Sequence, residues 1–560
     1  MPRRPACLLF CLVSLLPLSA SAKQLWLFGG GEPVCSSIET EFCVPEKLIA
    51  AEANFAKVEA LREKQFRFSP DAQQRLASIP RWAGDATRTR ALQEKLKATL
   101  APWGDKSVGA RDWHALLEPL GLADEEQGLV DDIFQVRALR KDGTTQEGQV
   151  YLDGSAEYVQ SIFRDFVAAA AGEQRKGSTE DPRVDTSRTA KPRVVILTAS
   201  SNDAFEFVTY YLSLFEAAGA QALWLPLEPA LIRAKDCSQL DALRFKWNGV
   251  HSRSAAHPEW AKVQREFCDH PERMQAFVDS ADAFFINGGD QSLTLRSLQL
   301  EPGKFTPLAQ RLLDRVAAGI PLGGSSAGTA VQSGNRAGTI PMFSGGQSAH
   351  ALRHGALPVE ANTVLCAVNG NCTMHGDADQ LTYRAQGGLR VFSIGTADTH
   401  FHERAREGRL LRLLLDTKSR FGFGVDEATV LKADIDEDDN AVLQVLGHGG
   451  VWIVDTAGAS ARKDSKQWSA SGFRATRLLA GDSARLTDGV LTVTLACKPP
   501  ATPAVAGEIA AADYANSNGA EWASIEDQPP KLACQRADGR WRYDQLPMTI
   551  SQKLEPADPR

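Results

Sequence analysis

Strand-like and helix-like segments alternate along the chain from Arg193 onward, and this alternation restricts the fold more than any other feature. The run "RVVILTAS" is rich in β-branched residues, as buried parallel strands are. The runs "QALWLPL", "ADAFFINGG" and "IPLGGSSAG" follow it, with helical patterns such as "DAFEFVTYYLSLFEAAGA" between them. Strands that alternate with helices form a mostly parallel sheet covered by helices on both faces. We therefore expect an α/β fold.

The segments that flank this alternation have different patterns. Upstream, "KQLWLFGGG" predicts a short strand that runs into glycines, and a mainly helical insertion follows it. Apolar residues recur there at steps of three and four, for example over Glu46–Phe66, as in an amphipathic helix. Downstream of Val425, "ATVLKAD", "NAVLQVLG" and "GVWIVDTAG" predict an antiparallel extension. Beyond Cys497 the chain is rich in Pro, Ala and polar residues, so we expect a loosely packed tail pinned by its cysteine.

The first 22 residues have the layout of a secretory signal peptide. Two arginines precede an apolar run from Ala6 to Leu18, and small residues lead to a cleavage site after Ala22. The apolar run is too short to span a bilayer, and no later segment reaches about 18 uninterrupted apolar residues. We expect an exported protein, in the periplasm or the medium. The expected divisions of the chain are the signal peptide 1–22, the first strand 23–31, the insertion and linker 32–191, the catalytic domain 192–497 and the tail 498–560.

The cysteines fit export. Eight of the ten remain after removal of the signal peptide, and an even number in an exported protein predicts disulfides. Short loops close most readily, which favours pairing of neighbours. The expected bonds are Cys35–Cys43, Cys237–Cys268, Cys366–Cys372 and Cys497–Cys534. With no CxxC pair and no HExxH motif, we expect no metal site.

The net charge limits the kinds of partner that we expect for this protein. The formal net charge of -7 argues against a general nucleic-acid binder, which usually has a basic face.

A G-x-S-x-G pattern at Gly324–Gly328 marks the first candidate for catalysis. A serine on a tight strand-to-helix turn has a strained backbone, and small neighbours prevent clashes there. Ser326 is the central residue, Ser325 is not, and the N–H of Ala327 could stabilise an oxyanion. The alternative is an ordinary glycine-rich loop.

Two further strand ends carry candidates. In "FFINGGDQ", an amide of Gly288 or Gly289 could be a second oxyanion donor, unless this is a plain strand-to-helix turn, which also favours glycine. His400 follows the strand "VFSIGTADT" and could deprotonate Ser326. His402 is its competitor, but we expect that residue on the helix surface.

A group of charged residues surrounds this histidine. Arginines bind carboxylates in bidentate fashion, so they could hold a substrate. The alternative is a solvated helix in which Glu403 and Glu407 pair with them. The group consists of Asp398, Arg404, Arg406 and Arg409.

Four segments together resemble the cyanophycinase family of serine peptidases: "FFINGGDQ", "GGSSAGTAV", "ADTHFHERAREGRL" and "GFGVDEATVL". They occur in the family's order, and the resemblance covers 23–31 and 193 to about 497. The family is similar in fold to class I glutamine amidotransferases, a flavodoxin-like arrangement. It cleaves cyanophycin, a poly-aspartate that bears arginine on its side-chain carboxylates, to β-aspartyl-arginine dipeptides without a metal or organic cofactor.

Carried over by residue, the resemblance implies Ser326 as nucleophile and His400 as base. It also implies Gln291, Asp398, Arg404, Arg406 and Arg409 around a peptide or polymer substrate. A homodimer is the assembly we consider.

The acid that would orient His400 is harder to assign. The family has a glutamate in a segment like "SGGQSAHALR", but residues 344–353 contain no acid; Ser348, Ala349 or His350 stands in its place. We take Asp377 as the third member, with Asp379 as competitor and Glu360 less favoured. The interval between Ser326 and His400 is wider than is usual in the family, and the cysteines at 366 and 372 would staple the inserted loop.

Three other functions are compatible with parts of this pattern. A peptidase for other aspartyl or isoaspartyl peptides would use the same serine site, although small α-aspartyl dipeptidases are compact and lack such an insertion. A catalytically silent binding protein would explain the missing acid, but would not need an activated serine. An α/β-hydrolase esterase ranks last, because it explains neither "GGDQ" nor the arginines.

Overall fold

The computed structural model describes residues 22–79, 86–177, 191–361, 376–497, 506–513, 520–525 and 528–554. The predicted signal peptide, apart from its last residue, and the predicted Cys366–Cys372 bond lie outside the described residues.

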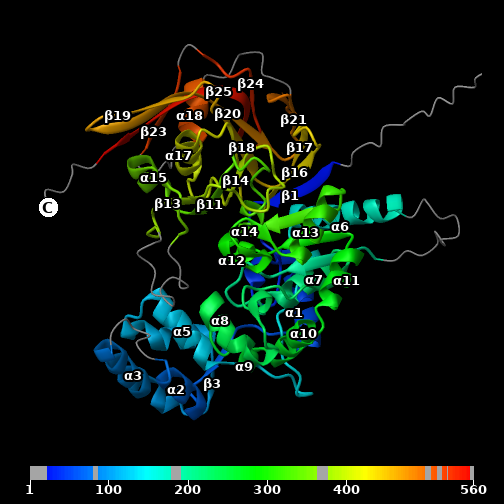
Figure 1. Cartoon of the computed structure of the whole chain (residues 1–560), viewed down its shortest axis with the longest axis vertical. Helices are drawn as coiled ribbons and strands as arrows, with labels where there is room; N and C mark the ends of the chain where they lie inside the picture. Colours follow the sequence, from blue (N-terminus) through cyan, green and yellow to red (C-terminus); the bar gives the residue numbers. More distant parts are fainter. Residues whose placement is uncertain are drawn as a thin grey trace, which may run out of the picture.

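The main sheet has nine strands, of which five are parallel (Figure 1). Across the sheet, the parallel strands are β6 (Gln221–Trp224), β5 (Arg193–Leu197), β7 (Ala283–Ile286), β10 (Leu322–Ser325) and β1 (Lys23–Phe28). The antiparallel strands β16 (Thr429–Ile435), β17 (Ala441–Gly447), β21 (Ser483–Thr487) and β22 (Val490–Thr494) continue it beyond β1. The expected α/β fold, with a mostly parallel sheet and an antiparallel extension, is confirmed.

Strand β1 shows why both faces of this sheet are covered. Successive side chains of a strand point to opposite faces. Leu25 and Leu27 join one hydrophobic core, which includes residues of the helices α11 (Glu272–Ser280), α12 (Gln291–Leu298) and α13 (Pro307–Ala317). Trp26 and Phe28 join a second core with α6 (Glu157–Gly177) and α7 (Val208–Ala217). Because both faces of β1 are buried, its sequence contains the continuous apolar run "LWLF".

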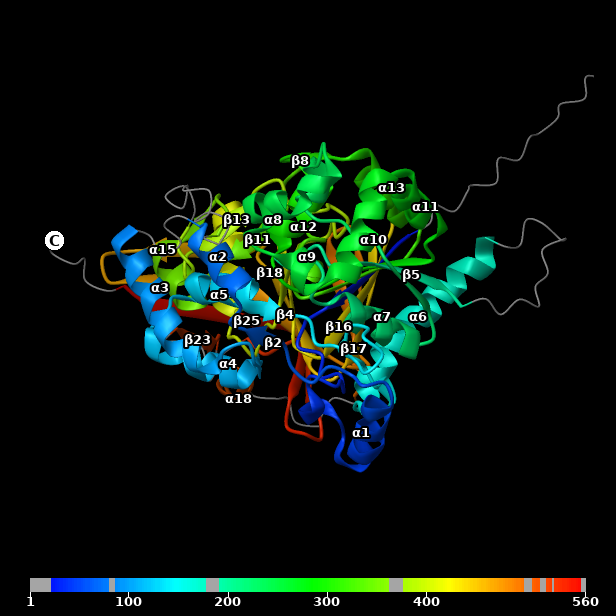
Figure 2. The ribbon, with the colours of Figure 1, turned by 90° about the horizontal axis from the view of Figure 1, so that it is seen from below.

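Between β1 and α6, the chain forms a helical unit with its own small core around Phe66 and Trp113, whose rings stack with centroids 5.0 Å apart. This unit lies at the lower end of Figure 1, and Figure 2 views the molecule from that end. Its elements are α2 (Pro70–Ala77), α3 (Ala86–Leu100), α4 (Ala110–Leu117), α5 (Asp124–Phe134), β2 (Gln65–Arg67), β3 (Ser107–Gly109) and β4 (Gln135–Val136). The preceding helix α1 (Leu48–Lys57) packs near the first disulfide.

The remaining helices of the described residues connect or cover these sheets. They are α8 (Leu240–Asn248), α9 (Arg253–Ala256), α10 (Pro258–Asp269), α14 (Ala327–Ala330), α15 (Ser348–His354), α17 (Glu407–Thr417) and α18 (Ala506–Asp513).

The described strands of the C-terminal region, β23 to β25, belong to a second sheet and are well packed, so the expectation of a loosely packed tail is wrong for them. Strand β25 (Trp541–Lys553) pairs along its length with β20 (Gln467–Leu479). Tyr543 and Met548 of β25 are fully buried in a core that also contains leucines of α17. The order of this sheet is β14 (Thr396–Thr399), β15 (Phe421–Val425), β18 (Gly450–Asp455), β20, β25 and β23 (Glu521–Ser524), with β19 (Ser460–Lys463) and β24 (Leu532–Gln535) at its sides.

Small antiparallel or mixed pairs complete the described strands. They are β8 (Gln299–Glu301) with β9 (Lys304–Phe305), and β11 (Met342–Gly345), β13 (Leu381–Arg384) and β12 (Ala356–Leu357) in one three-stranded sheet.

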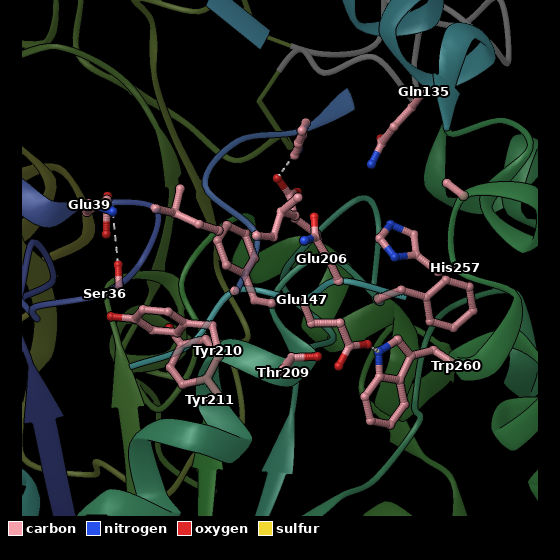
Figure 3. Close-up of a pocket in the computed structure, with 18 of the residues that line it drawn as sticks. Ser36, Glu39, Gln135, Glu147, Glu206, Thr209, Tyr210, Tyr211, His257 and Trp260 are labelled. Carbon is pink, nitrogen blue, oxygen red and sulfur yellow. Dashed lines mark hydrogen bonds and ion pairs between the residues drawn. The ribbon is translucent and has the colours of Figure 1, made fainter. Parts of the chain in front are cut away.

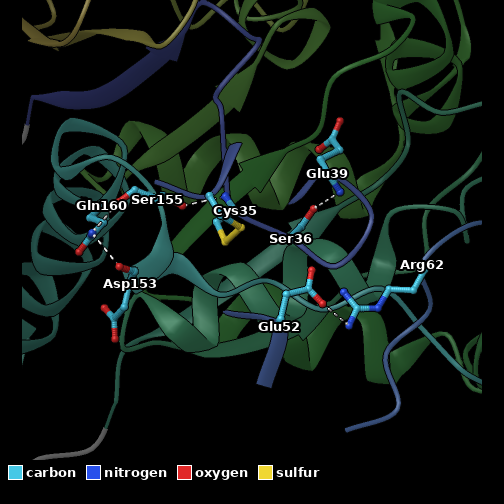
Figure 4. The surroundings of a disulfide bond; sticks show 9 residues. Cys35, Ser36, Glu39, Glu52, Arg62, Asp153, Ser155 and Gln160 are labelled. Carbon is cyan, nitrogen blue, oxygen red and sulfur yellow. Dashed lines mark hydrogen bonds and ion pairs between the residues drawn. A yellow bond between two sulfur atoms is a disulfide. The ribbon is translucent and has the colours of Figure 1, made fainter. Parts of the chain in front are cut away.

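Three of the expected disulfides are present: Cys35–Cys43, Cys237–Cys268 and Cys497–Cys534. The first holds the loop that follows β1, where the N–H of Cys35 also donates to the Ser155 hydroxyl at 2.8 Å (Figure 4). Disulfides of this kind are typical of proteins in oxidising compartments.

Across the described ranges, every helix is too short or too polar to cross a bilayer.

Truncation of Met548 tests the packing of β25. Met548→Ala removes a fully buried side chain, so we expect the free energy of unfolding to fall by about 2–5 kcal/mol. Urea denaturation measures this loss, and Lys553→Ala, at an exposed position of the same strand, should change stability little. Equal stability of the two variants would contradict a buried β25.

Candidate active site

Three side chains from separate strand ends form one hydrogen-bonded series. The hydroxyl Oγ of Ser326, after β10, lies 2.8 Å from Nε2 of His400, after β14. Nδ1 of the same imidazole lies 2.6 Å from Oε1 of Glu427, after β15. Ser326 follows a parallel strand of the main sheet, at the edge where α/β proteins place their sites, whereas His400 and Glu427 follow two neighbouring parallel strands of the second sheet. A nucleophile, a base and an orienting acid in this order can perform acyl transfer.

Ser326 occupies a strained turn that only small neighbours permit. Its backbone has φ 52° and ψ −110°, a conformation that costs energy for a residue with a side chain. A Cβ on Gly324 would lie 2.1 Å from the carbonyl oxygen of Gly328, and one on Gly328 would lie 2.2 Å from that of Ile286. The glycines of the G-x-S-x-G pattern are therefore required by close backbone contacts.

The glycine turn after β1 packs directly against this series. At Gly30, with φ 89°, a Cβ would lie 2.5 Å from Nε2 of His400, and at Gly31 one would lie 2.7 Å from the carboxylate of Glu427. The carbonyl of Gly29 accepts the N–H of His400 at 2.8 Å. These glycines are not among the predicted site residues. Their signal in the sequence is three glycines directly after a buried strand.

The surroundings of His400 favour its neutral form. Burial lowers the pKa of His400 below its usual 6.5; the hydrogen bond to Glu427 opposes this shift, and the charges of Arg404 and Arg406 add to it. A neutral imidazole can accept a proton from Ser326, whereas an imidazolium cannot.

The acid beside His400 is Glu427, which corrects the expectation of Asp377. Asp377 is exposed, and its N–H bonds to Oε1 of Gln380. Asp379 is also exposed, and Glu360 pairs with Arg296 and Arg384.

Strand pairing explains the position of Glu427. Strands β14 and β15 run parallel with Thr399 opposite Val425, so the residues that follow both strands reach the same edge. Glu427 lies in the segment "GFGVDEATVL", and the available signal was two acids, Asp426 and Glu427, that follow a buried strand.

The predicted oxyanion donors adjoin the serine. A Cβ on Gly288 would lie 3.4 Å from Cβ of Ser326, and Gly288 and Gly289 line the same cavity as that serine. Ala327 follows it directly and begins α14. Their part in catalysis stays a prediction.

Asp398 and Arg409 bind each other and are not presented to a substrate. Asp398 is 1% exposed, and Nε of Arg409 donates to its Oδ2 at 2.8 Å. Although burial raises the pKa of Asp398, the guanidinium of Arg409 brings it below its usual value. Arg409 also donates to the carbonyl of Gly346 at 2.6 Å. The expectation of substrate contacts by this pair is therefore corrected: the pair holds the segment that carries His400.

Two other predicted contacts are also used within the protein. Gln291 donates its amide N–H groups to the carbonyls of Phe343 and Ser344 at 2.8 and 3.0 Å. Arg406 donates to the carbonyl of Thr399 at 2.7 Å. Burial and the nearby Arg409 lower the pKa of Arg406 to about 9.

Two of the candidate residues considered after β14, Arg404 and His402, are exposed. Arg404 lies close enough to His400 to lower its pKa, so it is the predicted arginine that can still meet a substrate. His402 pairs with Glu407 at 3.1 Å and lies in the turn that precedes α17, whereas it was expected on the helix surface.

A cavity of about 480 Å³ opens beside Ser326 and His400, and Figure 3 shows much of its lining. Glu32 is a lining residue that is not among the predicted site residues. Its carboxylate accepts the N–H of Gly30 at 3.0 Å and the hydroxyl of Ser325 at 2.9 Å. Burial, with a smaller contribution from Glu427, raises its pKa.

Substitution of Glu427 tests the series. Glu427→Gln keeps the shape but removes the charge that stabilises the imidazolium, so we expect Ser326 to react with a fluorophosphonate roughly 10²–10⁴-fold more slowly. Asp377→Asn is the matched control and should react at the wild-type rate. The reverse pattern would restore Asp377 as the orienting acid.

The pH dependence of the same labelling reaction follows the ionisation of His400. The rate should rise with pH through the pKa of His400, with a midpoint below pH 6.5, because the folded protein lowers that pKa. Arg404→Gln removes a positive charge that disfavours the imidazolium, so its midpoint should move to higher pH. A midpoint above 6.5 in the wild type would contradict the environment described for His400.

Comparisons with known proteins find cyanophycinases as similar sequences. No family model matches the chain. A cyanophycinase from Geminocystis herdmanii (strain PCC 6308) is 31% identical over 195 residues, which are 35% of this chain and 55% of that protein. Cyanophycinases from Trichormus variabilis (strain ATCC 29413 / PCC 7937) and Synechococcus elongatus are 30% and 32% identical over 34% and 33% of this chain, and 51% and 45% of their own. The chain thus spans about half the length of the curated relatives it matches.

Among solved structures, a peptidase from an acI-B1 Actinobacterium aligns with 59% of this chain and 93% of its own at 17% identity, with a TM-score of 0.31. A likeness of this size carries no argument about function. In sequence, the chain is similar to cyanophycinases over about a third of its length.

Proposed function

We propose that this protein is a serine peptidase that hydrolyses cyanophycin to β-aspartyl-arginine dipeptides. The observation that carries the proposal is the hydrogen-bonded series of Ser326, His400 and Glu427 beside an open cavity. The relatives that are named cyanophycinases support the choice of substrate.

In the proposed mechanism, Oγ of Ser326 attacks the carbonyl carbon of the peptide bond while Nε2 of His400 takes its proton. Glu427 stabilises the resulting imidazolium. The N–H groups of Ala327 and of Gly288 or Gly289 hold the oxyanion of the tetrahedral intermediate. The C–N bond then breaks, and His400 gives the proton to the leaving amine.

The acyl-enzyme that remains is hydrolysed by water. His400 takes a proton from the water as the oxygen attacks the ester carbonyl, and returns it to Oγ of Ser326 as the serine leaves. The products are a carboxylic acid, the amine of the first step and the free enzyme, so no external reactant besides water is required.

A second candidate is a peptidase for short aspartyl or isoaspartyl peptides. The cavity beside Ser326 favours it, because a space of about 480 Å³ suits a peptide of two or three residues as well as the end of a polymer. The alternative of a catalytically silent binding protein depended on a missing orienting acid. It is less favoured, because Glu427 lies beside His400 as that acid.

Export is part of the proposal. The arginines, apolar run and small residues at the N-terminus support it, and so do the three disulfides.

Dipeptide release from purified cyanophycin tests the proposal. The mature protein should release β-aspartyl-arginine, and Ser326→Ala should lose nearly all of this activity because the nucleophile is gone. Ser78→Ala, at an exposed position of the helical unit, is the matched control and should keep it. If a correctly folded wild type leaves cyanophycin intact but cleaves short isoaspartyl peptides, the second candidate replaces the first.

A further inference from the structure

The cavity beside Ser326 has one wall from the main fold and one from the segment between β1 and α6. Phe205, Tyr210 and Trp260 belong to the first wall. The second wall includes Glu39 and Glu147, which precede and follow the helical unit. A substrate bound at Ser326 would therefore meet both walls at once (Figure 3).

The cations of the lining are already paired with carboxylates. Lys64 forms an ion pair with Glu206, and Arg137 forms one with Glu259 at 3.1 Å. The other lining carboxylates are Glu32, Glu39 and Glu147. Among the described residues, no lysine or arginine forms an ion pair with any of these three, so the cavity carries an excess of negative charge.

The lining carboxylates also act on neighbouring groups. After burial, which is the largest cause, the charge of Glu41 raises the pKa of Glu39. After burial and Tyr211, the charges of Glu39 and Glu32 raise the pKa of Tyr210 well above its usual value. Burial disfavours any charge, but these contributions from carboxylates favour a cation.

Aromatic residues give this cavity a shape suited to a particular cation. The indole N–H of Trp260 donates to Oε1 of Glu147 at 2.8 Å, which fixes the carboxylate next to a ring (Figure 3). Tyr210 adds a second ring to the lining. A guanidinium is planar, stacks on aromatic faces and matches the two oxygens of a carboxylate, so it fits this combination better than a compact ammonium does.

We propose that Glu147, oriented by Trp260, binds a guanidinium side chain of the substrate. The segment between β1 and α6 thereby contributes a specificity subsite to the active site. This inference rests on the proposed function, since it places the arginine of an arginine-bearing peptide in this cavity.

Binding of two dipeptides tests the subsite without catalysis. Isothermal titration calorimetry on Ser326→Ala compares β-aspartyl-arginine with β-aspartyl-citrulline, which has nearly the same shape but no charge. We expect the arginine dipeptide to bind at least tenfold more tightly. Glu147→Gln in the same background should reduce this preference about tenfold, whereas Glu94→Gln, exposed on α3 outside the cavity, should leave it unchanged.

Trp260→Phe is the second variant, because it keeps a ring but removes the N–H that orients Glu147. It should reduce the preference for arginine by less than Glu147→Gln does. Melting temperatures of both variants show whether the fold is retained.

The outcomes separate the subsite from the proposed function. A preference for arginine that depends on Glu147 supports the subsite even if the wild type fails to cleave cyanophycin, in which case the proposed polymer activity alone fails. Equal binding of both dipeptides, no binding of either, or a preference unchanged in Glu147→Gln and Trp260→Phe would overturn the subsite even if cyanophycin is cleaved.

Discussion

The contact between the backbone at Gly30 and the His400 ring is the constraint on which the site depends. The strand β1 lies between β10, which carries Ser326, and β16, which follows Glu427 closely in sequence. Its glycine turn fills the space among the three side chains, so that a single added methyl group would lie 2.5 Å from the imidazole. The hydrogen bonds of the series can form only because the backbone of β1 approaches them without side chains.

A buried ion pair also helps to hold His400 in position. The ion pair of Asp398 and Arg409 lies beneath the turn that carries His400, and Arg409 also holds the carbonyl of Gly346. Burying two charges costs solvation free energy, and this cost is offset only when their remaining hydrogen bonds are satisfied. Here Asp398 and Arg409 bond to each other and to backbone groups, so the turn that carries His400 has one preferred position. Asp398 and Arg409, which were expected to surround the substrate, thus act as positioning residues for His400.

The strand ends explain which site residues could be predicted. Ser326, Gly288 and His400 each follow an apolar run. The parallel strands β10 and β7 of the main sheet end at one edge, which brings Ser326 and Gly288 together, whereas His400 follows β14 of the second sheet. Glu427 also follows an apolar run, but the sequence does not show that its strand β15 pairs with β14, and this pairing is what makes Glu427 the acid beside His400. The roles expected for Asp398 and Arg409 differ from those observed because sequence does not show whether a charged side chain is buried. The C-terminal strand β25 was hidden by the proline- and alanine-rich composition around it, although its apolar residues fill a core.

By itself, the sequence determined the α/β class, the strained serine turn and three cysteine pairs, because each depends on residues that are near in the chain or on a pattern with a fixed period. The tertiary structure decided which acid meets His400, which charges are buried against each other, and that a distant helical segment lines the cavity. These three features depend on strand order and on packing between layers, even for residues as near in the chain as Asp398 and Arg409. Local patterns carry no information on either.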